Sequence, residues 1–469
     1  MPPRPRHVIW ITSDHMRYDC IAAHGNDEVH TPNLDRLVAG GVSYDHCYGQ
    51  NPLCMPSRCS FMTGLYPQQT GVTCNGHCLP PDFAPTIARA FSAGNYQTAQ
   101  IGKLHFQPHE DSDLDPRPRH DYGFDVLWQA EEPGNYEDAY MNWLRTEYPQ
   151  FVELFRVPRP NAPARVEEAT GRVLDAPWQA SFSGWVAEQT CRYLLGHWGP
   201  REGNHFVHMG IYAPHPPLNP TREMMAPYEG RRVTVPPRSA DEAADKPSPL
   251  RGMLAMCRGW DDERFESYRR HFYAMVTGVD LAVGQVLEQL EQAGQLDETL
   301  IVFGADHGDM CGDHGMVTKQ ASFYDQLMRL PLVLHWPAGL GRRPMRVTGL
   351  TEMVDVLPTL LELAGCNVPA CMVGRSHAEA LLAGRQPETR EDVIAFDGPG
   401  HMMLRTATHK YILYADGGEV LYDLSEQPAE TVNRAADAGC ADMLAEMRLR
   451  LLDRAIHASR SPLPLRYRY

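Results

Sequence analysis

Short apolar runs that end in polar residues recur along the chain. Val8–Ile11 leads into Thr12–His15, and Thr299–Gly304 leads into Asp306–Asp309. Continuous apolar runs are typical of strands that are buried on both faces of a parallel sheet. Further runs of this kind are Thr98–Ile101, His205–Ile211 and Pro331–His335. We therefore predict an α/β fold with a large, mixed and mostly parallel sheet sandwiched by helices, whose carboxyl edge carries polar side chains and binds ligands.

One long helix is the clearest helical prediction. Between Phe265 and Gln292, apolar residues recur every three or four positions, which indicates the buried stripe of an amphipathic helix. We interpret this stripe as core packing. Shorter helices are predicted from Pro32, which Thr31 precedes as a cap, and over Val354–Leu363.

The chain is predicted to divide near residue 385. Beyond it, shorter alternating runs predict a small antiparallel sheet, followed by a helix over 441–456. These runs are Val393–Phe396, Met402–Arg405, Lys410–Tyr414 and Val420–Asp423. We predict a large domain of residues 1–385 and a smaller α+β subdomain of residues 386–469. Residues 107–184 are rich in Pro, Asp and Glu, and we predict a long irregular insertion over one rim of the ligand site.

Composition limits the classes of function. The chain has 469 residues, of which 43% are hydrophobic, and a net charge of -16, which argues against a nucleic-acid-binding protein. No apolar stretch approaches the roughly 18 residues of a membrane span, and Met1–Arg6 leads into the first strand without the apolar core of a signal peptide. We expect a cytoplasmic protein whose 12 cysteines are mostly reduced. Cys74 and Cys78 lack a second Cys or His pair at the spacing of a zinc finger, which argues against a zinc site.

One cysteine occupies a position suited to chemistry. Asn51–Leu53 reads as extended chain, and Pro56 suits the first turn of a helix, where its missing N–H removes no hydrogen bond. We therefore expect Cys54 just outside a helix N-terminus, where free N–H groups favour negative charge. Arg58, one turn into the helix, adds a permanent cation. Taken alone, such a segment more often holds only a half-buried cysteine, but a nucleophile there could attack an anionic group and hold it during transfer.

A family resemblance favours the chemical interpretation. The segment Leu53-Cys54-x-Pro56-Ser57-Arg58 resembles the activation signature of the type I sulfatases of the alkaline phosphatase superfamily, in which the cysteine is oxidised to formylglycine. The resemblance covers nearly the whole chain and is carried by Gly102–His105, Pro214–Pro217, Ala305–Lys319 and Thr406–Asn433. It implies an alkaline phosphatase-like fold, conversion of Cys54 to formylglycine (3-oxoalanine) by a formylglycine-generating enzyme, a small-molecule ester substrate and a homo-oligomer.

The resemblance also implies one divalent metal ion, held by Asp14, His15, residue 54, Asp306 and His307. Most sulfatases carry Asp-Asp and Asp-Asn at these two pairs, whereas Asp306-His307 is similar to the choline sulfatases and phosphonate monoester hydrolases. The imidazoles leave Ca²⁺ open and raise Mn²⁺ or another transition metal as the alternative. His15 could instead contact the substrate or support a ligand, with Asp14 alone binding the ion from the first pair.

The resemblance implies roles for the remaining polar residues. A hydrated aldehyde at position 54 attacks the ester, while His215, with Lys319, protonates the leaving alcohol and His105 acts as the base that regenerates the aldehyde. Asn75 and His77 are candidates for contact with the substrate. The cations expected to balance charge on the transferred group are Arg58, Lys103 and Lys319. Residues predicted to cap or to form hydrogen bonds only are Asp309, Asp313 and His314.

Three functions remain open at this point. The first is hydrolysis of sulfate monoesters of a small organic alcohol or phenol. The second keeps the site but changes the ester to a phosphonate monoester or a phosphodiester, which carries the same single negative charge. The third is an inactive binding protein, which predicts an unmodified Cys54 and no turnover. The sequence does not indicate which alcohol leaves.

Overall fold

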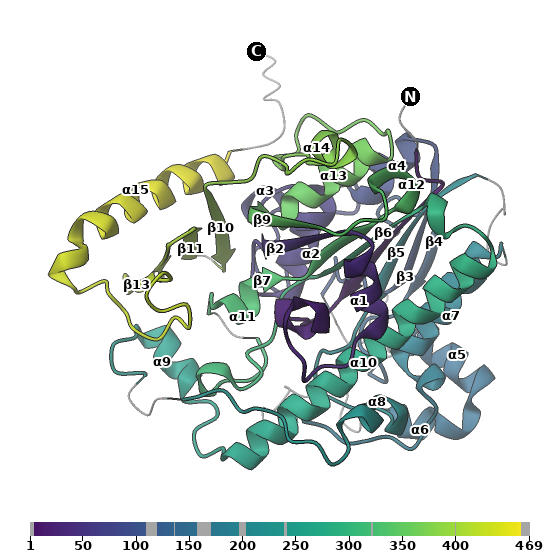
Figure 1. The fold of residues 1–469 in the computed structure, drawn as a ribbon, viewed down its shortest axis with the longest axis horizontal. Coiled ribbons are helices and arrows are strands. Elements are labelled where there is room, and N and C mark those ends of the chain that lie inside the picture. The colour runs from purple at the N-terminus through teal and green to yellow at the C-terminus, as the bar shows by residue number, and fades with distance from the viewer. Residues whose placement is uncertain are drawn as a thin grey trace.

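The large sheet forms the centre of the molecule. The structure is a computed structural model that describes residues 4–108, 120–135, 137–156, 170–196, 203–238, 242–319, 322–398 and 400–460. Within these ranges, nine strands pair in the order β4-β3-β5-β1-β6-β8-β2-β7, and β9 pairs with β2 (Figure 1). The strands are β1 His7–Ser13, β2 Val42–Tyr48, β3 Tyr96–Gly102, β4 Val126–Gln129, β5 Asn204–Ile211, β6 Thr299–Ala305, β7 Arg329–Leu330, β8 Leu332–His335 and β9 Met345–Glu352.

Most neighbouring strands of this sheet are parallel. Among the described strand pairs of this sheet, three are antiparallel: β6–β8, β2–β8 and β2–β7. The mixed and mostly parallel sheet that we predict is therefore confirmed. β1 and β6 are buried along their whole length, which explains why both read as continuous apolar runs.

Register brings several strand ends to one edge. Ser13, the last residue of β1, pairs with Ile211 of β5 on one side and with Ala305 of β6 on the other. Gly102 of β3 pairs with Gly210 of β5. Residues that follow these strands therefore emerge side by side, although nearly 300 positions separate the first from the last.

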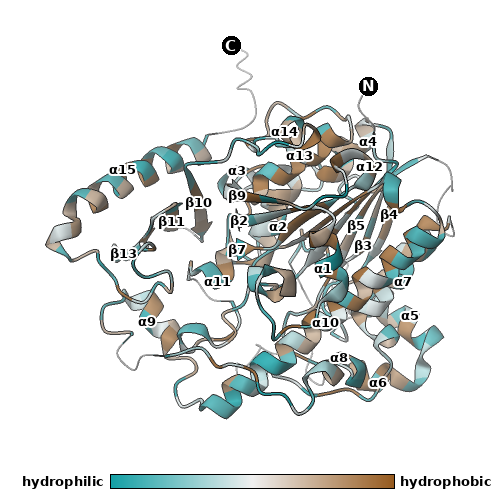
Figure 2. Cartoon of the chain, in the orientation of Figure 1, coloured by the Kyte–Doolittle hydropathy of each residue, from teal (hydrophilic) through white to brown (hydrophobic). Residues whose placement is uncertain are grey.

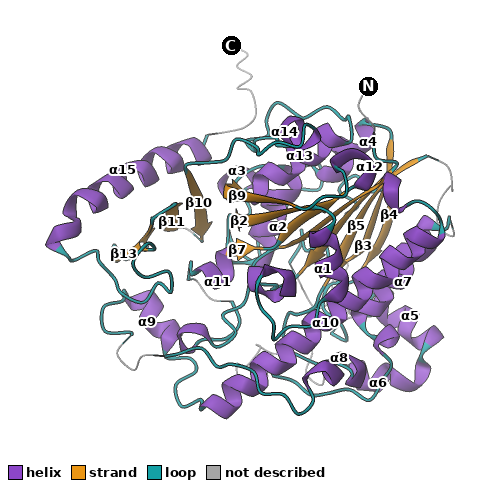
Figure 3. Ribbon diagram, viewed as in Figure 1, coloured by secondary structure: helices purple, strands orange, loops and turns teal. Residues whose placement is uncertain are grey.

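Two helical layers cover the sheet (Figure 3). On one side, α10 packs against α1 and α7, of which α1 contacts β8 and α7 contacts β3 and β5. On the other, α2, α4 and α13 pack together, and Phe91 of α4 stacks on Phe206 of β5. The longer helices are α1 Pro32–Ala39, α2 Cys54–Thr63, α4 Ile87–Ala93, α7 Phe182–Leu194, α10 Asp262–Gln292 and α13 Val356–Leu363.

The remaining helices are shorter or peripheral. They are α3 Pro67–Thr70, α5 Ala139–Glu147, α6 Val152–Phe155, α8 Arg222–Met225, α9 Ser248–Leu254, α11 Asp325–Met328, α12 Pro337–Leu340, α14 Ala378–Leu382 and α15 Ala441–Ala458. None of the helices that the structure describes is both long and apolar enough to cross a bilayer.

Two sequence-based expectations need correction. First, the segment 107–184 is not irregular throughout: where it is described, β4 adds an edge strand to the sheet and α5 buries Tyr140, Met141 and Leu144. Second, α2 begins at Cys54 itself, with Leu53 as its N-cap, so the cysteine lies in the first turn of the helix rather than before it.

The C-terminal part carries its own sheet. In the described chain, β10 Asp392–Asp397, β11 His401–Thr406, β12 His409–Leu413 and β13 Glu419–Asp423 form an antiparallel sheet in sequence order. α15 packs its apolar side, including Leu444, Met447 and Leu451, onto this sheet. Its outer side mixes hydrophilic residues with the exposed Leu449, Leu452 and Ile456, and Figure 2 shows both kinds of residue along the helix. The antiparallel sheet and helix are confirmed, whereas a domain boundary at residue 385 stays a prediction.

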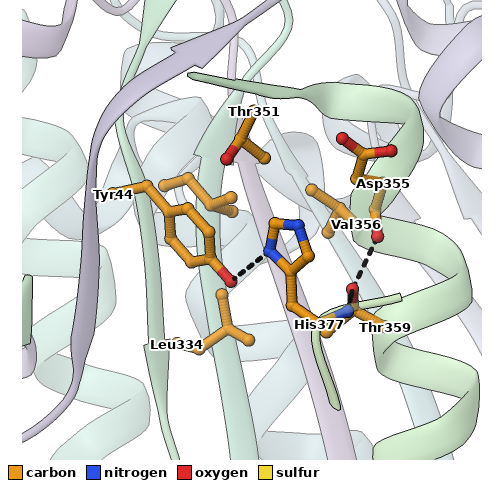
Figure 4. Close-up of a pocket in the computed structure, with 8 residues that line it drawn as sticks. Tyr44, Leu334, Thr351, Asp355, Val356, Thr359 and His377 are labelled. Carbon is orange, nitrogen blue, oxygen red and sulfur yellow. Dashed lines mark hydrogen bonds between the residues drawn. The ribbon is translucent and has the colours of Figure 1, made fainter. Parts of the chain in front are cut away.

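A small cavity lies between the sheet and α13, away from the residues that we single out for chemistry. It has a volume of about 10 Å³, which suits one water molecule. His377 Nδ1 lies 3.2 Å from the hydroxyl of Tyr44 across it (Figure 4). We interpret this cavity as part of the core, because its other walls are side chains of β8, β9 and α13.

Candidate active site

The site forms where β1, β6 and α2 meet. The backbone N–H of Asp14 donates to Ile211 O at 3.1 Å, and that of Asp306 donates to Ser13 O at 3.3 Å, so both carboxylates leave the sheet at the same level. The hydroxyl of Ser57 donates to Asp306 O at 2.5 Å, which ties the first turn of α2 to the end of β6. Cys54 is thereby brought to the two strand ends.

The donor atoms converge into two overlapping groups. Asp14, Cys54, Asp306 and His307 offer ligand atoms that all lie within 4.8 Å of one another, and so do Asp14, His15, Cys54 and His215. Cys54 Sγ lies 3.2 Å from His307 Nε2 and 3.6 Å from Asp14 Oδ1. Carboxylate oxygens and imidazole nitrogens at such separations fit the donor set of a divalent ion. The five residues implied as metal ligands thus lie together, and His215 joins them.

Three cations surround these donors. Arg58 Nε donates to Asp306 Oδ2 at 2.8 Å, and Lys103 Nζ lies 2.5 Å from Asp14 Oδ2. Lys319 Nζ contacts Cys54 Sγ and lies 3.4 Å from His215 Nε2. Although burial acts against its charge, Lys103, followed by His215 and Arg58, holds the pKa of the Asp14 carboxyl well below its usual value. With two carboxylates and three cations, the site can receive an anion in a protein whose net charge is -16.

Lys103 depends on a close approach of two strands. Gly102 has a φ of +93°, and a Cβ atom there would lie 2.1 Å from Gly210 O. Because only glycine tolerates both conditions, β3 can turn sharply at this point and direct Lys103 toward Asp14. Lys103 is fully buried, and the attraction of Asp14 outweighs burial and raises the pKa of its ammonium group.

The encoded thiol is a poor nucleophile at this position. Burial, together with the charge on Asp14, raises the pKa of Cys54 to about 11 despite the nearby lysines. At neutral pH the side chain is therefore a neutral thiol. Position 54 has the surroundings of a reactive group, but the reactivity of this thiol is suppressed.

His215 and His307 both point Nε2 into the site. His215 Nδ1 lies 2.6 Å from Pro216 O, and His307 Nδ1 lies 2.9 Å from Gly308 O. Because a carbonyl only accepts, both rings must carry their proton on Nδ1, which leaves a lone pair on Nε2. Burial lowers the pKa of His15, His215 and His307, which favours neutral rings.

Other predicted residues lie farther from the donor groups. His105 is buried two residues beyond Lys103, but its ring belongs to neither group of donor atoms. Asn75 Oδ1 accepts the N–H of Met55, one residue from Cys54. His77 is exposed, with Nε2 3.5 Å from the sulfur of Cys74.

The residues predicted to cap or to form hydrogen bonds make such contacts. Asp313 accepts from Arg17 NH1 at 2.6 Å, and His314 pairs with Glu242 and stacks on Tyr324. Asp309 Oδ1 accepts two backbone N–H groups.

Sequence reasoning missed two supporting residues. Glu131 Oε1 accepts the N–H of His105 at 3.0 Å and that of Leu104 at 3.4 Å, and so holds this turn. Tyr268 donates its hydroxyl to Asp309 Oδ2 at 3.0 Å. Neither carries a motif: Glu131 lies in the acidic stretch that we interpreted as an insertion, and Tyr268 lies on the apolar stripe of α10.

Comparison with protein families shows the family of the chain. The family model described as Sulfatase matches residues 6–366, which include Asp14, Cys54 and Asp306. The chain belongs to the sulfatase family. A second model, described as the C-terminal part of N-sulphoglucosamine sulphohydrolase, matches residues 312–457.

Relatives of this sulfatase family member carry several activities in their names. It is 27% identical to the multifunctional alkaline phosphatase superfamily protein PehA of Trinickia caryophylli, with 97% of this chain and 96% of the relative covered. It is 26% identical to an arylsulfatase of Clostridium perfringens, covering 91% and 89%. It is also 27% identical to a choline-sulfatase of Rhizobium meliloti, covering 87% and 78%.

Solved structures support the same fold. The phosphonate monoester hydrolase of Agrobacterium radiobacter superposes with a TM-score of 0.81 at 25% identity, covering 97% of this chain and 96% of that one. The fold is therefore that of the alkaline phosphatase superfamily, as the resemblance implies. The sulfatases and phosphonate monoester hydrolases among its relatives make this chain a hydrolase of the sulfatase family.

Proposed function

We propose that the protein hydrolyses sulfate monoesters of a small organic alcohol or phenol with a formylglycine that is made from Cys54. The observation that carries this proposal is the position of Cys54. It lies in the first turn of α2, within 4 Å of Asp14 and His307 and in contact with Lys319, and its thiol has a pKa of about 11. Charged side chains surround Cys54, but its raised pKa keeps the thiol in its unreactive neutral form. These surroundings favour catalysis by a modified side chain at position 54 over catalysis by the cysteine itself.

The residues present fit a divalent ion, Ca²⁺ or Mn²⁺, held by Asp14, His15, residue 54, Asp306 and His307. Among the described atoms, His15 Nε2 is buried without a hydrogen-bond partner, as expected of a ligand atom. When bound, the ion and the hydrated aldehyde would supply an activated hydroxyl group as nucleophile.

The chain's own residues have separate roles in binding the substrate and in transferring protons. Arg58, Lys103 and Lys319 neutralise the oxygens of the sulfate group and hold it for in-line attack. The ammonium group of Lys319 supplies a proton to His215 Nε2, which lies 3.4 Å from Lys319 Nζ, and His215 passes this proton to the leaving alcohol. His105 is the proposed base for the second hydroxyl of residue 54. Asn75 and His77 are proposed contacts with the substrate.

A second function shares this site. Hydrolysis of phosphonate monoesters or phosphodiesters is favoured by the Asp306-His307 pair and by the TM-score of 0.81 with a phosphonate monoester hydrolase. A comparison of kcat/KM on matched aryl sulfate, phosphonate and phosphodiester substrates separates the two. We expect the sulfate to be preferred, and a clear preference for phosphorus would reverse the assignment.

We also propose a cytoplasmic location, a formylglycine-generating enzyme as maturation partner, and a homo-oligomer. All 12 cysteines lie in the described ranges and none forms a disulfide, which suits a reducing compartment. Neither nucleic acid nor membrane is a proposed partner, in keeping with the net charge of -16.

The decisive experiment is mass spectrometry of the peptide that bears residue 54, from protein produced with and without a formylglycine-generating enzyme. We expect conversion of the thiol to the aldehyde, turnover in proportion to conversion, and about one divalent ion per chain. The variant Cys54→Ala is the control for background hydrolysis. An unmodified Cys54 without turnover, even after co-expression, would favour the inactive binding protein instead.

A further inference from the structure

Asp309 is a carboxylate with every acceptor position in use. Its Oδ1 accepts the N–H of Cys311 at 2.7 Å and that of Thr318 at 3.0 Å. Its Oδ2 accepts the hydroxyl of Tyr268 at 3.0 Å and lies 3.1 Å from His15 Nδ1. The side chain is fully buried and is held from α10 and from its own loop. Asp309 therefore has one orientation, and it presents a fixed acceptor to His15.

This acceptor decides which nitrogen of His15 carries the proton. Nδ1 faces a carboxylate oxygen that already accepts from Tyr268, so the ring donates from Nδ1 and keeps a lone pair on Nε2. The ring has little freedom to turn over. It is 1% exposed and lies 4.3 Å, centroid to centroid, from the rings of both His215 and His307.

The Nε2 lone pair faces a second acceptor. His15 Nε2 has no hydrogen-bond partner among the described atoms, and it lies 3.9 Å from Asp14 Oδ1. Two lone pairs that face each other without a proton repel, unless a cation lies between them. Their separation of 3.9 Å leaves room for one ion that both atoms could bind. His15 also shares a group of donor atoms with Asp14 and Cys54.

We propose that Asp309 is a positioning residue that holds His15 in the Nδ1–H form, makes His15 Nε2 a ligand of the ion bound by Asp14 and residue 54, and thereby biases the site toward Mn²⁺ over Ca²⁺. This inference rests on the metal site of the proposed function. A metal-binding histidine commonly donates its other N–H to a carboxylate, and loss of that carboxylate costs 10–100-fold in metal affinity.

The bias follows from donor chemistry. Ca²⁺ takes six to eight ligands that are nearly all oxygen, whereas imidazole suits transition metals. His15 and His307 would place two nitrogens among the ligands. Compared with the Asp-Asp and Asp-Asn pairs of most sulfatases, the first pair replaces Asp by His and the second replaces Asn by His, so that each difference removes an oxygen. The chain itself therefore offers a direct test, because His15→Asp restores the oxygen at one pair.

The experiment measures metal affinity and not turnover. Formylglycine-bearing protein is stripped with a chelator and titrated with Mn²⁺ and with Ca²⁺ by calorimetry. For His15→Asp we expect the ratio of the Mn²⁺ to the Ca²⁺ association constant to fall at least tenfold. For Asp309→Ala we expect Mn²⁺ affinity to fall about 10–100-fold, with a smaller change for Ca²⁺.

A matched control is available in the same protein. Glu242 is a buried carboxylate that pairs with Nδ1 of His314, outside both donor groups. Glu242→Gln should leave both metal affinities within twofold. If His15→Asp leaves the ratio within twofold of the parent, the proposal is wrong, whether or not Asp309→Ala folds. A shifted ratio in a protein that hydrolyses no ester would instead support the ligand assignment and overturn the proposed hydrolase.

Discussion

At the scale of single residues, His215 offers the sharpest test of mechanism. Its Nδ1 donates a hydrogen bond to Pro216 O at 2.6 Å, and its Nε2 faces Lys319. The centroid of its ring lies 4.6 Å from that of Tyr212. The ring can therefore exchange a proton only through Nε2. A group that protonates the leaving oxygen should matter most where that oxygen is basic.

For His215→Ala we expect kcat/KM on an alkyl sulfate to fall by about 10²–10⁴. The loss on 4-nitrophenyl sulfate should be much smaller, because nitrophenolate leaves without a proton. Steady-state kinetics with a series of aryl and alkyl sulfates measures this as a steeper dependence on leaving-group pKa. An equal loss on all members of the series would assign His215 to binding rather than to proton transfer.

Residues of the site differ in how far the sequence reveals them. Cys54, Asp14 and Asp306 follow apolar runs or precede a helix, so their convergence follows from the geometry of a parallel sheet. The contact between His15 and Asp309 spans 294 positions and depends on the rotamer of each side chain. No local pattern encodes it, and the sequence predicts only that both residues lie near the same edge.

At the scale of elements, a buried carboxylate links α10 to the start of α1. Asp280 accepts the N–H groups of Asn33 and Leu34 at 2.9 Å and 2.8 Å, and the side-chain amide of Asn33 at 2.8 Å. These bonds satisfy free N–H groups in the first turn of α1. Burial nevertheless outweighs them and raises the pKa of Asp280 from 3.8 to about 7.

This shift predicts a pH-dependent stability. Because the folded-state pKa lies above the unfolded value, the contribution of Asp280 is complete below pH 3.8 and is lost as the pH rises toward 7. The neutral variant Asp280→Asn should therefore gain stability relative to the parent over this interval, at up to roughly 1.4 kcal/mol per pH unit. Urea unfolding at several pH values measures the difference. A difference that does not change with pH would contradict the raised pKa.

Elements were predictable where burial imposes one pattern. β1, β5 and β6 are largely buried; β1 and β6 contain unbroken apolar runs, and β5 contains one that only His208 interrupts. α10 shows its stripe over many turns. α5 was missed because its surroundings are rich in Pro, Asp and Glu, and its four buried residues within nine positions are too few to outweigh that composition. The order of strands in the sheet depends on long-range pairing that periodicity does not express.

At the scale of the whole molecule, the C-terminal sheet binds a segment of the chain that lies close in sequence to Lys319. Lys410 on β12 is fully buried and donates to Phe323 O at 2.9 Å and to Asp325 Oδ1 at 2.6 Å. Its ammonium group also lies 2.5 Å from Glu430. Lys319, which contacts Cys54, precedes Phe323 by four positions. The family model that matches residues 312–457 joins Lys319 and the C-terminal sheet in one unit.

This arrangement predicts that a change far from position 54 reduces catalysis. Lys410→Met leaves the buried carboxylate of Glu430 without its cation and the partly exposed Asp325 with Arg405 alone, which should cost about 3–5 kcal/mol of unfolding free energy. It should also lower kcat, because the segment that leads from Lys319 loses its anchor to β12.

The control Arg434→Met removes a partly exposed cation that pairs with Glu426 and Asp437, and it should cost less than about 1 kcal/mol. Thermal unfolding and steady-state kinetics, at a temperature where both variants are folded, distinguish the effects. A destabilised Lys410→Met variant with parental kcat would mean that Lys319 is positioned by the large sheet alone.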